Sequence, residues 1–261
     1  MNEEQYKYFQ EWAKNHILTF QEADPLHQRS LDLKAAHTFR VCKASQRIVS
    51  GLGLSKNDFR IASVTALFHD IGRFPQYKKY RTFRDLDSDN HAKLSVWELN
   101  RHRVLHRLNF TERQVISLAI FFHNRLRIPG NIDPKTLLHC KLIRDADKVD
   151  ILRVMVEHFH MPESQQNPVI TLGLAADPLV REEVYRMLLN RRIMNYAEVK
   201  TINEFKVLQM SWVFDINFRP TFEILRERNY TGLLAATLPD TPLLREALDC
   251  VNSYIEERLQ C

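Results

Sequence analysis

The sequence contains little glycine and no sustained strand pattern. Only 6 of its 261 residues are Gly, and VITLGL, residues 169–174, is the only short strand candidate. Leu, Glu, Lys, Arg and Ala, which are common in helices, are abundant. The composition therefore predicts an all-α protein.

Long basic runs and long apolar runs are missing as well. Lys and Arg number 37 against 32 Asp and Glu, without a concentrated basic stripe, so there is no strong signal for nucleic-acid binding. The apolar runs are too short to cross a bilayer, which predicts no membrane partner. The acidic, polar start MNEEQYKYFQ does not resemble a signal peptide. We therefore expect a cytoplasmic protein.

Cysteine pairs with metal-binding or redox spacing are also absent. No C-x-x-C motif occurs, and the cysteines are widely separated along the chain. Such spacing predicts free thiols in a reducing compartment. The four residues are Cys42, Cys140, Cys250 and Cys261.

Helix-start signals recur along the chain. Ser55 with Asp58 resembles a capping box, and Asp133 before Pro134 places an N-cap ahead of a first-turn proline. Periodicity predicts further helices over residues 3–20, 31–50 and 89–108. Other predicted helix starts are Thr111 with Gln114, Asp177–Pro178, Thr201 with Glu204, and Thr241–Pro242.

A polar segment bracketed by prolines, MPESQQNP at 161–168, marks the predicted domain boundary. It separates a helical domain, residues 1–160 with a core at about 30–155, from residues 161–261. We expect the second part to be a helical C-terminal extension packed on that core.

The dipeptide His69–Asp70 ends the apolar run of ALFHDIGR. Both side chains are costly to bury without partners. The candidate partners are His37, His91, His123 and Asp147, and all of these except His91 lie among apolar residues on predicted helices. Imidazole and carboxylate groups from separate helices can converge inside a bundle and hold metal.

Nitrogen and oxygen donors without a thiolate suit Mn, Fe, Co, Zn or Mg. A His set with two Asp residues would hold one ion, and His91 and His123 would permit a second. Two cations roughly 3.5–4 Å apart need a bridging carboxylate. Asp70, next to a His ligand, is the natural bridge. We therefore predict one or two divalent metal ions.

The ordered set resembles the signature of the HD-domain superfamily of metal-dependent phosphohydrolases. The segments HTFRV, ALFHDIGR and IRDADKVD resemble the sequence motifs that surround the metal ligands in that family. The resemblance extends over about residues 30–155. The resemblance implies an HD-domain helical bundle, here with additional C-terminal helices, that holds metal through His37, His69, Asp70 and Asp147. It also implies that His91 and His123 complete a second site, as in binuclear members.

The resemblance further implies hydrolysis of a phosphate ester, in a nucleotide or another small phosphorylated metabolite, by metal-activated water. Asp70 would hold or bridge the metal and orient the water. Arg73 stands where relatives commonly have Lys, and a guanidinium can grip phosphate through two hydrogen bonds. Arg73, Lys148 and Arg40 are the predicted substrate contacts, and a basic loop at 77–84 suits an anionic substrate.

Two alternatives stay open at this point. The first is an oxygenase, because some HD-fold proteins use the same six-ligand pattern to hold two irons and activate oxygen. The second is a non-catalytic ligand-binding HD module. The sequence also leaves open whether the C-terminal helices cover the site or form a homodimer interface.

Asp150 is expected to be a helix-surface charge. The histidines expected to have no role in the site are His16, His27, His102, His106, His139, His158 and His160.

Overall fold

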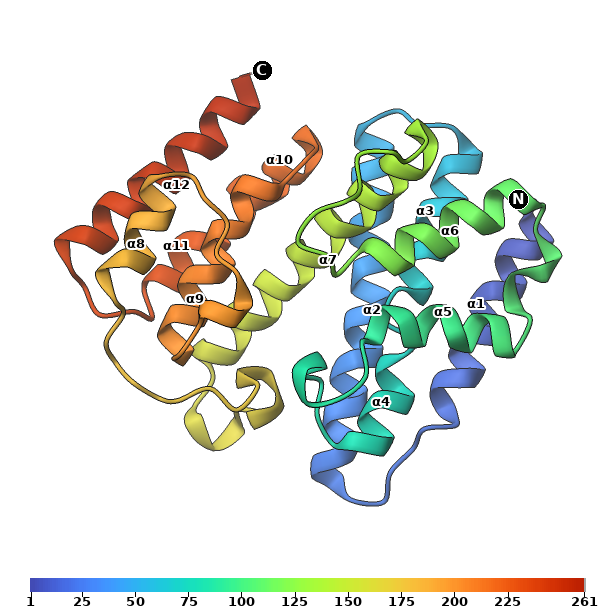
Figure 1. The fold of residues 1–261 in the computed structure, drawn as a ribbon, viewed down its shortest axis with the longest axis horizontal. Helices are drawn as coiled ribbons and strands as arrows, with labels where there is room; N and C mark the ends of the chain where they lie inside the picture. Colours follow the sequence, from blue (N-terminus) through green and yellow to red (C-terminus); the bar gives the residue numbers. More distant parts are fainter. Residues whose placement is uncertain (261) are drawn as a thin grey trace. The chain divides into compact units, whose positions relative to one another are not determined.

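The computed structural model describes residues 1–260, which form α-helices joined by turns and short 3-10 helices (Figure 1). The chain divides into two compact units, Met1–Asp150 and the residues from Ile151 onwards, and helix α7 (Pro134–His160) crosses this division. The all-α prediction is confirmed. The predicted boundary near residue 160, and the packing of an extension on the core, stay predictions.

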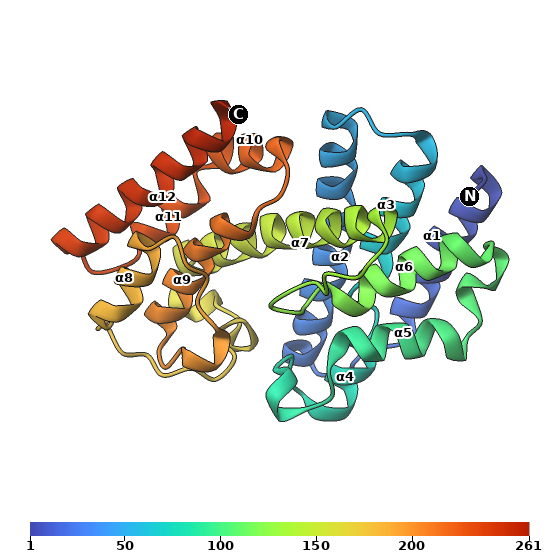
Figure 2. The same ribbon diagram turned by 45° about the horizontal axis from the view of Figure 1, so that its top comes forward.

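The first unit is built from helices whose apolar faces meet in one core. Helices α2 and α3 pack along each other, and α6 packs against both α3 and α5 (Figures 1 and 2). Fully buried side chains such as Phe9, Ile61, Phe68 and Ile116 fill the space between them. The helices are α1 (Glu3–Leu18), α2 (Pro25–Gly51), α3 (Lys56–Phe68), α4 (Arg73–Tyr80), α5 (His91–Arg101), α6 (Phe110–Phe122) and the start of α7.

Side-chain caps fix where several of these helices begin. Ser55 accepts a hydrogen bond from the backbone N–H of Asp58 and starts α3, as predicted. Asp133 accepts one from the backbone N–H of Thr136 ahead of Pro134, also as predicted. Helix α2 begins earlier than expected, because Asp24 caps it and Pro25 occupies its first position. The caps therefore set the positions of α2, α3 and α7.

Three predictions about the first unit are wrong in detail. Residues 89–108 do not form one helix: α5 ends at Arg101, and Arg103 adopts a left-handed backbone (φ 52°) that breaks the helix. Asn109, not Thr111, caps α6, because an Asn two residues earlier offers an equally good acceptor. The expected basic loop at 77–84 begins within helix α4, which extends to Tyr80, since a proline is tolerated in a first helical turn.

In the second unit, α12 packs against α8 and α10 (Figure 2). Thr201 caps α9 and Thr241 lies ahead of α12, both as predicted. Asp177 does not start a helix, because α8 begins only at Glu182. The prediction of a short strand at residues 169–174 is also wrong. Its start forms a 3-10 turn, and it continues through two left-handed residues, Leu172 and Gly173. The helices are α8 (Glu182–Leu189), α9 (Ile202–Ser211), α10 (Arg219–Arg228), α11 (Tyr230–Ala235) and α12 (Pro242–Gln260).

Gly72 lets the turn between α3 and α4 approach α5 closely. Its N–H donates to Ser95 Oγ at 2.9 Å, and that hydroxyl donates to the carbonyl oxygen of His69 at 2.7 Å. A Cβ added at Gly72 would lie only 2.6 Å from the carbonyl oxygen of His91. The absence of a side chain therefore fixes the distance between the His69–Asp70 turn and the start of α5.

We expect Gly72→Ala to lower the free energy of unfolding by about 1–3 kcal/mol, because the new methyl group must push α5 away. Urea denaturation measures this loss. Gly130→Ala is the matched control, since a Cβ there meets nothing within 4 Å. Equal stability of Gly72→Ala and the wild type would contradict the close approach.

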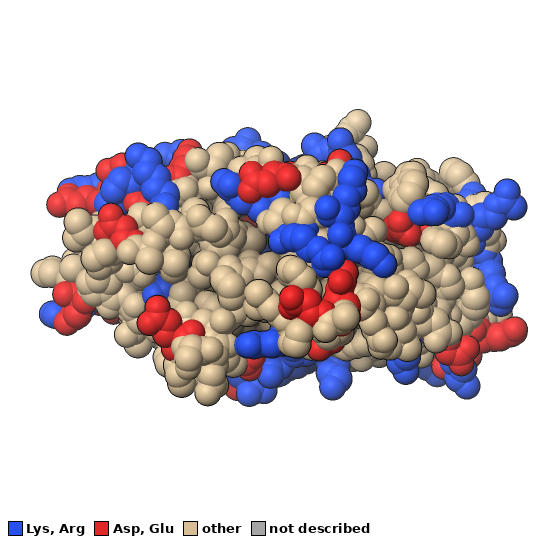
Figure 3. Space-filling model, turned by 90° about the horizontal axis from the view of Figure 1, so that it is seen from below, with Lys and Arg blue, Asp and Glu red and all other residues tan. Residues whose placement is uncertain are grey.

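Figure 3 shows one face on which groups of Lys and Arg side chains have Asp and Glu beside them. None of the helices within residues 1–260 has the length and apolar character that crossing a membrane requires. Cys42, Cys140 and Cys250 are free thiols, as predicted, and burial raises the pKa of Cys42 and of Cys140 to about 12. Cys261 lies outside the described residues.

Candidate metal centre

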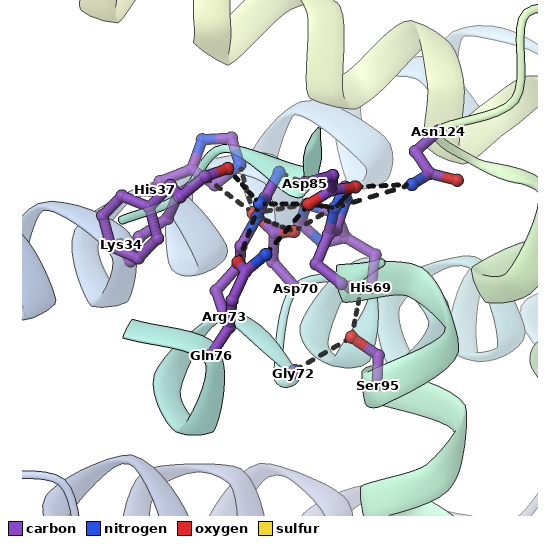
Figure 4. Close-up of polar contacts among 12 residues, drawn as sticks. Lys34, His37, His69, Asp70, Gly72, Arg73, Gln76, Asp85, Ser95 and Asn124 are labelled. Atoms are coloured by element: carbon purple, nitrogen blue, oxygen red, sulfur yellow. Dashed lines mark hydrogen bonds and ion pairs between the residues drawn. The ribbon is translucent and has the colours of Figure 1, made fainter. Parts of the chain in front are cut away.

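Six predicted ligands converge inside the first unit. Figure 4 labels three of them, His37, His69 and Asp70. Each comes from a helix or from the residues that end one, so the packing of the helices positions all of them. His37 lies on α2, His69 and Asp70 follow α3, His91 starts α5, His123 ends α6 and Asp147 lies on α7. All are buried except Asp147, whose side chain is 18% exposed. The structure therefore brings together groups that are as many as 110 residues apart along the chain (147 − 37).

Asp70 lies at the centre, and its two oxygens face different histidines. Oδ2 lies 3.5 Å from His37 Nε2 and 3.7 Å from His69 Nε2. Oδ1 lies 3.5 Å from His91 Nε2 and 4.0 Å from His123 Nε2. A carboxylate shared between two groups of nitrogen donors has the arrangement of a bridge between two metal ions.

Asp147 completes the first of these groups. Its Oδ1 lies 3.1 Å from His37 Nε2 and 3.5 Å from His69 Nε2. These three atoms are buried and have no hydrogen-bond partner within the described residues. Buried polar atoms without partners are costly, and a cation among them would satisfy all three. The residues present therefore fit a divalent metal ion.

The histidine rings are held with Nε2 directed inward. His69 Nδ1 donates to the carbonyl oxygen of Ala66 at 2.7 Å, and His123 Nδ1 donates to that of Ile120 at 2.6 Å. A carbonyl oxygen only accepts, so the proton of each neutral ring lies on Nδ1 and the lone pair on Nε2. This is the usual arrangement of metal-binding histidines.

The charge states of Asp70 and His123 also suit metal binding. Burial alone would raise the pKa of Asp70, but Lys34, His69 and Arg73 outweigh it and hold that pKa well below its usual range. Burial, together with His91 and His69, lowers the pKa of His123 to about 3. Asp70 is therefore ionised and His123 neutral at pH 7.

A pair of cations flanks Asp70. Lys34 Nζ lies 2.8 Å from Asp70 Oδ2, and Arg73 Nε lies 3.4 Å from Oδ1. Arg73 is itself held by Asp85 Oδ1 at 2.8 Å and by the carbonyl oxygen of Phe83 at 2.5 Å. Positive charge is thus fixed on both sides of the bridging carboxylate, from α2 and from the start of α4.

Arg40 and Asp150 support His37 from outside the cluster. Asp150 Oδ2 accepts from His37 Nδ1 at 2.7 Å, and Arg40 donates to both Asp150 oxygens at 2.6 and 3.0 Å. The expectation that Asp150 is a surface charge is wrong, because only 3% of the residue is exposed. Asp147 and Asp150 are three residues apart on α7, so they share a helix face, and that spacing was the available signal.

We expect Asp150→Asn to weaken Mn²⁺ binding about 10–100-fold, because partners of ligating histidines typically contribute that much. The amide keeps the shape of the side chain but loses the charge that favours His37 in its required orientation. Isothermal titration calorimetry measures the affinity. Asp32→Asn, an exposed carboxylate on the same α2 that carries His37, is the control and should bind normally. An Asp150→Asn variant with wild-type affinity would contradict this role.

Asp85 supports His91 in the same way. Its Oδ2 accepts from His91 Nδ1 at 2.6 Å and from Asn124 at 3.2 Å. Neither Asp85 nor Lys34 was among the predicted site residues. Lys34 is one turn before His37 on α2 and was detectable from that spacing. Asp85 lies in a short 3-10 turn (Asp85–Asp87), where no periodicity indicates its direction.

Of the three predicted substrate contacts, Arg73 contacts the cluster of ligands directly, through Asp70 and His91. Arg40 reaches it through Asp150. Lys148, next to Asp147 on α7, is partly buried. The roles of all three toward a substrate stay predictions.

The first unit has an all-α fold and a cluster of His and Asp residues that could hold a divalent metal ion. These two features are typical of helical metal-binding proteins. Residues 35–152 match the family model of the HD domain, and this range contains all six converging residues. Residues 35–152 therefore carry an HD domain, the domain of the metal-dependent phosphohydrolase superfamily. Neither the search of curated proteins nor that of solved structures gave a match.

Proposed function

We propose that the protein is a metal-dependent phosphohydrolase that cleaves a phosphate ester of a small metabolite, with nucleotides as the first candidates. The observation that carries this proposal is the position of Asp70, whose two oxygens face two separate groups of histidine nitrogens. Two-metal sites with a shared carboxylate are common in enzymes that displace groups at phosphorus.

The residues divide into two ligand sets. His37, His69 and Asp147 would hold one ion together with Asp70 Oδ2. His91 and His123, whose Nε2 atoms are 3.0 Å apart, would hold the second together with Asp70 Oδ1. Two neutral imidazoles with Nε2 lone pairs at this distance repel each other, and a shared cation removes that repulsion.

Divalent ions in such a site polarise the phosphoryl oxygens and lower the pKa of water towards neutrality, which makes a nucleophile available at ordinary pH. Asp70 faces both ligand sets and so fixes their positions relative to each other. It also accepts a hydrogen bond from Lys34. We propose that Arg73 stabilises the negative charge that develops on the phosphoryl group. Its contacts with Asp85 and Phe83 hold the guanidinium in place before the substrate arrives.

The remaining predicted contacts have different proposed roles. Arg40 is proposed as a positioning residue, because both of its hydrogen bonds to Asp150 serve His37. Lys148 is proposed to contact the substrate from α7. The basic residues of α4 and the following turn, Lys78, Lys79 and Arg81, are proposed to attract an anionic substrate.

Phosphate release by the metal-stripped protein, reloaded with Mn²⁺ under anaerobic conditions, tests the proposal. A panel of nucleotides and generic phosphoesters serves as substrate, and magnesium, cobalt, zinc and ferrous ions follow in parallel. We expect turnover of at least one phosphoester without dioxygen. Activity only with iron in air would favour the oxygenase alternative, and ligand binding without turnover for any metal would favour a binding module.

A further inference from the structure

A second group of metal-ligating side chains lies outside the Asp70 centre. His16 comes from the last turn of α1, and Glu98 and His102 come from the end of α5, four residues apart on one face. The three ligand atoms all lie within 4.8 Å of one another. None of these residues touches the six ligands of the Asp70 centre in any contact described above, so the group is a separate feature of the first unit.

The distances in this group match those between ligands of one ion. Glu98 Oε2 lies 3.6 Å from His16 Nε2 and 3.3 Å from His102 Nε2. Ligands that bind zinc tetrahedrally at 2.0–2.2 Å are roughly 3.3–3.5 Å from each other. The single oxygen Oε2 faces both imidazoles, while Arg101 lies 3.9 Å from the other oxygen. The arrangement leaves Oε2 directed at the space between the two rings.

His16 supplies an independent indication of a ligand. Its side chain is only 9% exposed, yet Nε2 has no hydrogen-bond partner among the described residues. Trp12 stacks on the ring at 4.5 Å with an angle of 14°, and Phe20 packs against it edge-on. The aromatic residues therefore fix the ring with an unsatisfied buried nitrogen directed at Glu98.

One further property favours a bound metal ion over a plain ion pair. The other side of the group is open, because the side chain of His102 is 41% exposed. An ion can therefore enter from solvent, and water can complete its coordination.

We propose that His16, Glu98 and His102 form a second, independent site for a zinc-class divalent transition-metal ion. Two imidazoles and one carboxylate are a recognised zinc ligand set that leaves one position for water. The ion would join the end of α1 to the end of α5, the helix whose first residue is His91. Occupancy should therefore stabilise the first unit, independently of any turnover at the Asp70 centre.

Zinc counting in the full-length protein tests the proposal. Metal-stripped Asp70→Asn and the double variant Asp70→Asn/His102→Gln are equilibrated with Zn²⁺, dialysed and analysed for bound zinc. Asp70→Asn weakens zinc binding at the Asp70 centre. The difference in bound zinc between the two variants therefore measures binding at His16, Glu98 and His102. We expect one more zinc per chain in Asp70→Asn than in the double variant. We also expect Zn²⁺ to raise the melting temperature of the wild type more than that of His102→Gln.

The matched control is His106→Gln, an exposed histidine four residues further on that should bind and respond to zinc as the wild type does. Because His102 is on the surface, its replacement should leave the fold intact, and the melting temperature without metal checks this. Equal zinc content in Asp70→Asn and the double variant would overturn the proposal, and so would an equal thermal response of His102→Gln and the wild type.

Discussion

Asp70→Asn is expected to release both central ions and to lower phosphoester hydrolysis by at least about 1,000-fold, since even the partners of metal ligands contribute about 10–100-fold. The amide offers one neutral oxygen, so it cannot bridge two ion positions. It also leaves Lys34 and Arg73 facing each other without the carboxylate that separates their charges. Bound Mn²⁺ per chain and the rate of phosphate release measure the two effects together.

Asp87→Asn is the matched control, because this carboxylate lies in the nearby 3-10 turn but is half-exposed and pairs only with Arg84 in the contacts described. It should keep the wild-type metal content and rate. Circular dichroism of both variants establishes that the helices are intact. Full activity of Asp70→Asn, or retention of two manganese ions, would contradict the bridging role.

His91→Gln should remove one central ion and keep the other. His91 Nε2 faces Asp70 Oδ1, whereas His37 and His69 face Oδ2, so the loss affects one ligand set. We expect the Mn²⁺ content to fall from two ions to one per chain and the hydrolysis rate to fall by at least about 100-fold, because the charge that stabilises the phosphoryl group is halved. Titration calorimetry resolves the two binding events.

His37→Gln provides the complementary experiment, because it affects the other ligand set. Both variants should bind one ion, and the double variant His37→Gln/His91→Gln should bind almost none. His106→Gln controls for the loss of an imidazole elsewhere on the surface. If His91→Gln kept two ions, or lost both, the division of the ligands into two sets would be wrong.

The six metal-ligand candidates could be proposed as one set from the sequence, because each lies in a short recognisable motif or at the end of an apolar helix. The residues that support them were not recognised. Asp85 reaches His91 from a turn, and Asp150 reaches His37 across 113 residues of sequence. Such contacts depend on how helices pack, and local patterns carry no information about packing partners.

Helix starts were predicted best where a side chain caps the helix directly. Ser55, Asp133 and Thr201 behave as expected because their acceptors lie within three residues of the N–H groups they bind. The end of α5 was missed because Arg103 takes a left-handed backbone without being Gly or Asn. The two residues that follow Arg103, Val104 and Leu105, are buried in the fold.

Hydrolysis in ¹⁸O-labelled water under anaerobic conditions tests most directly the claim that water attacks phosphorus in the Asp70 centre. The Mn²⁺-loaded protein and its preferred phosphoester are incubated without dioxygen, and mass spectrometry locates the label. The account predicts one solvent oxygen in the released phosphate and none in the alcohol product. Label in the alcohol, or product formation only when dioxygen is admitted, would contradict it.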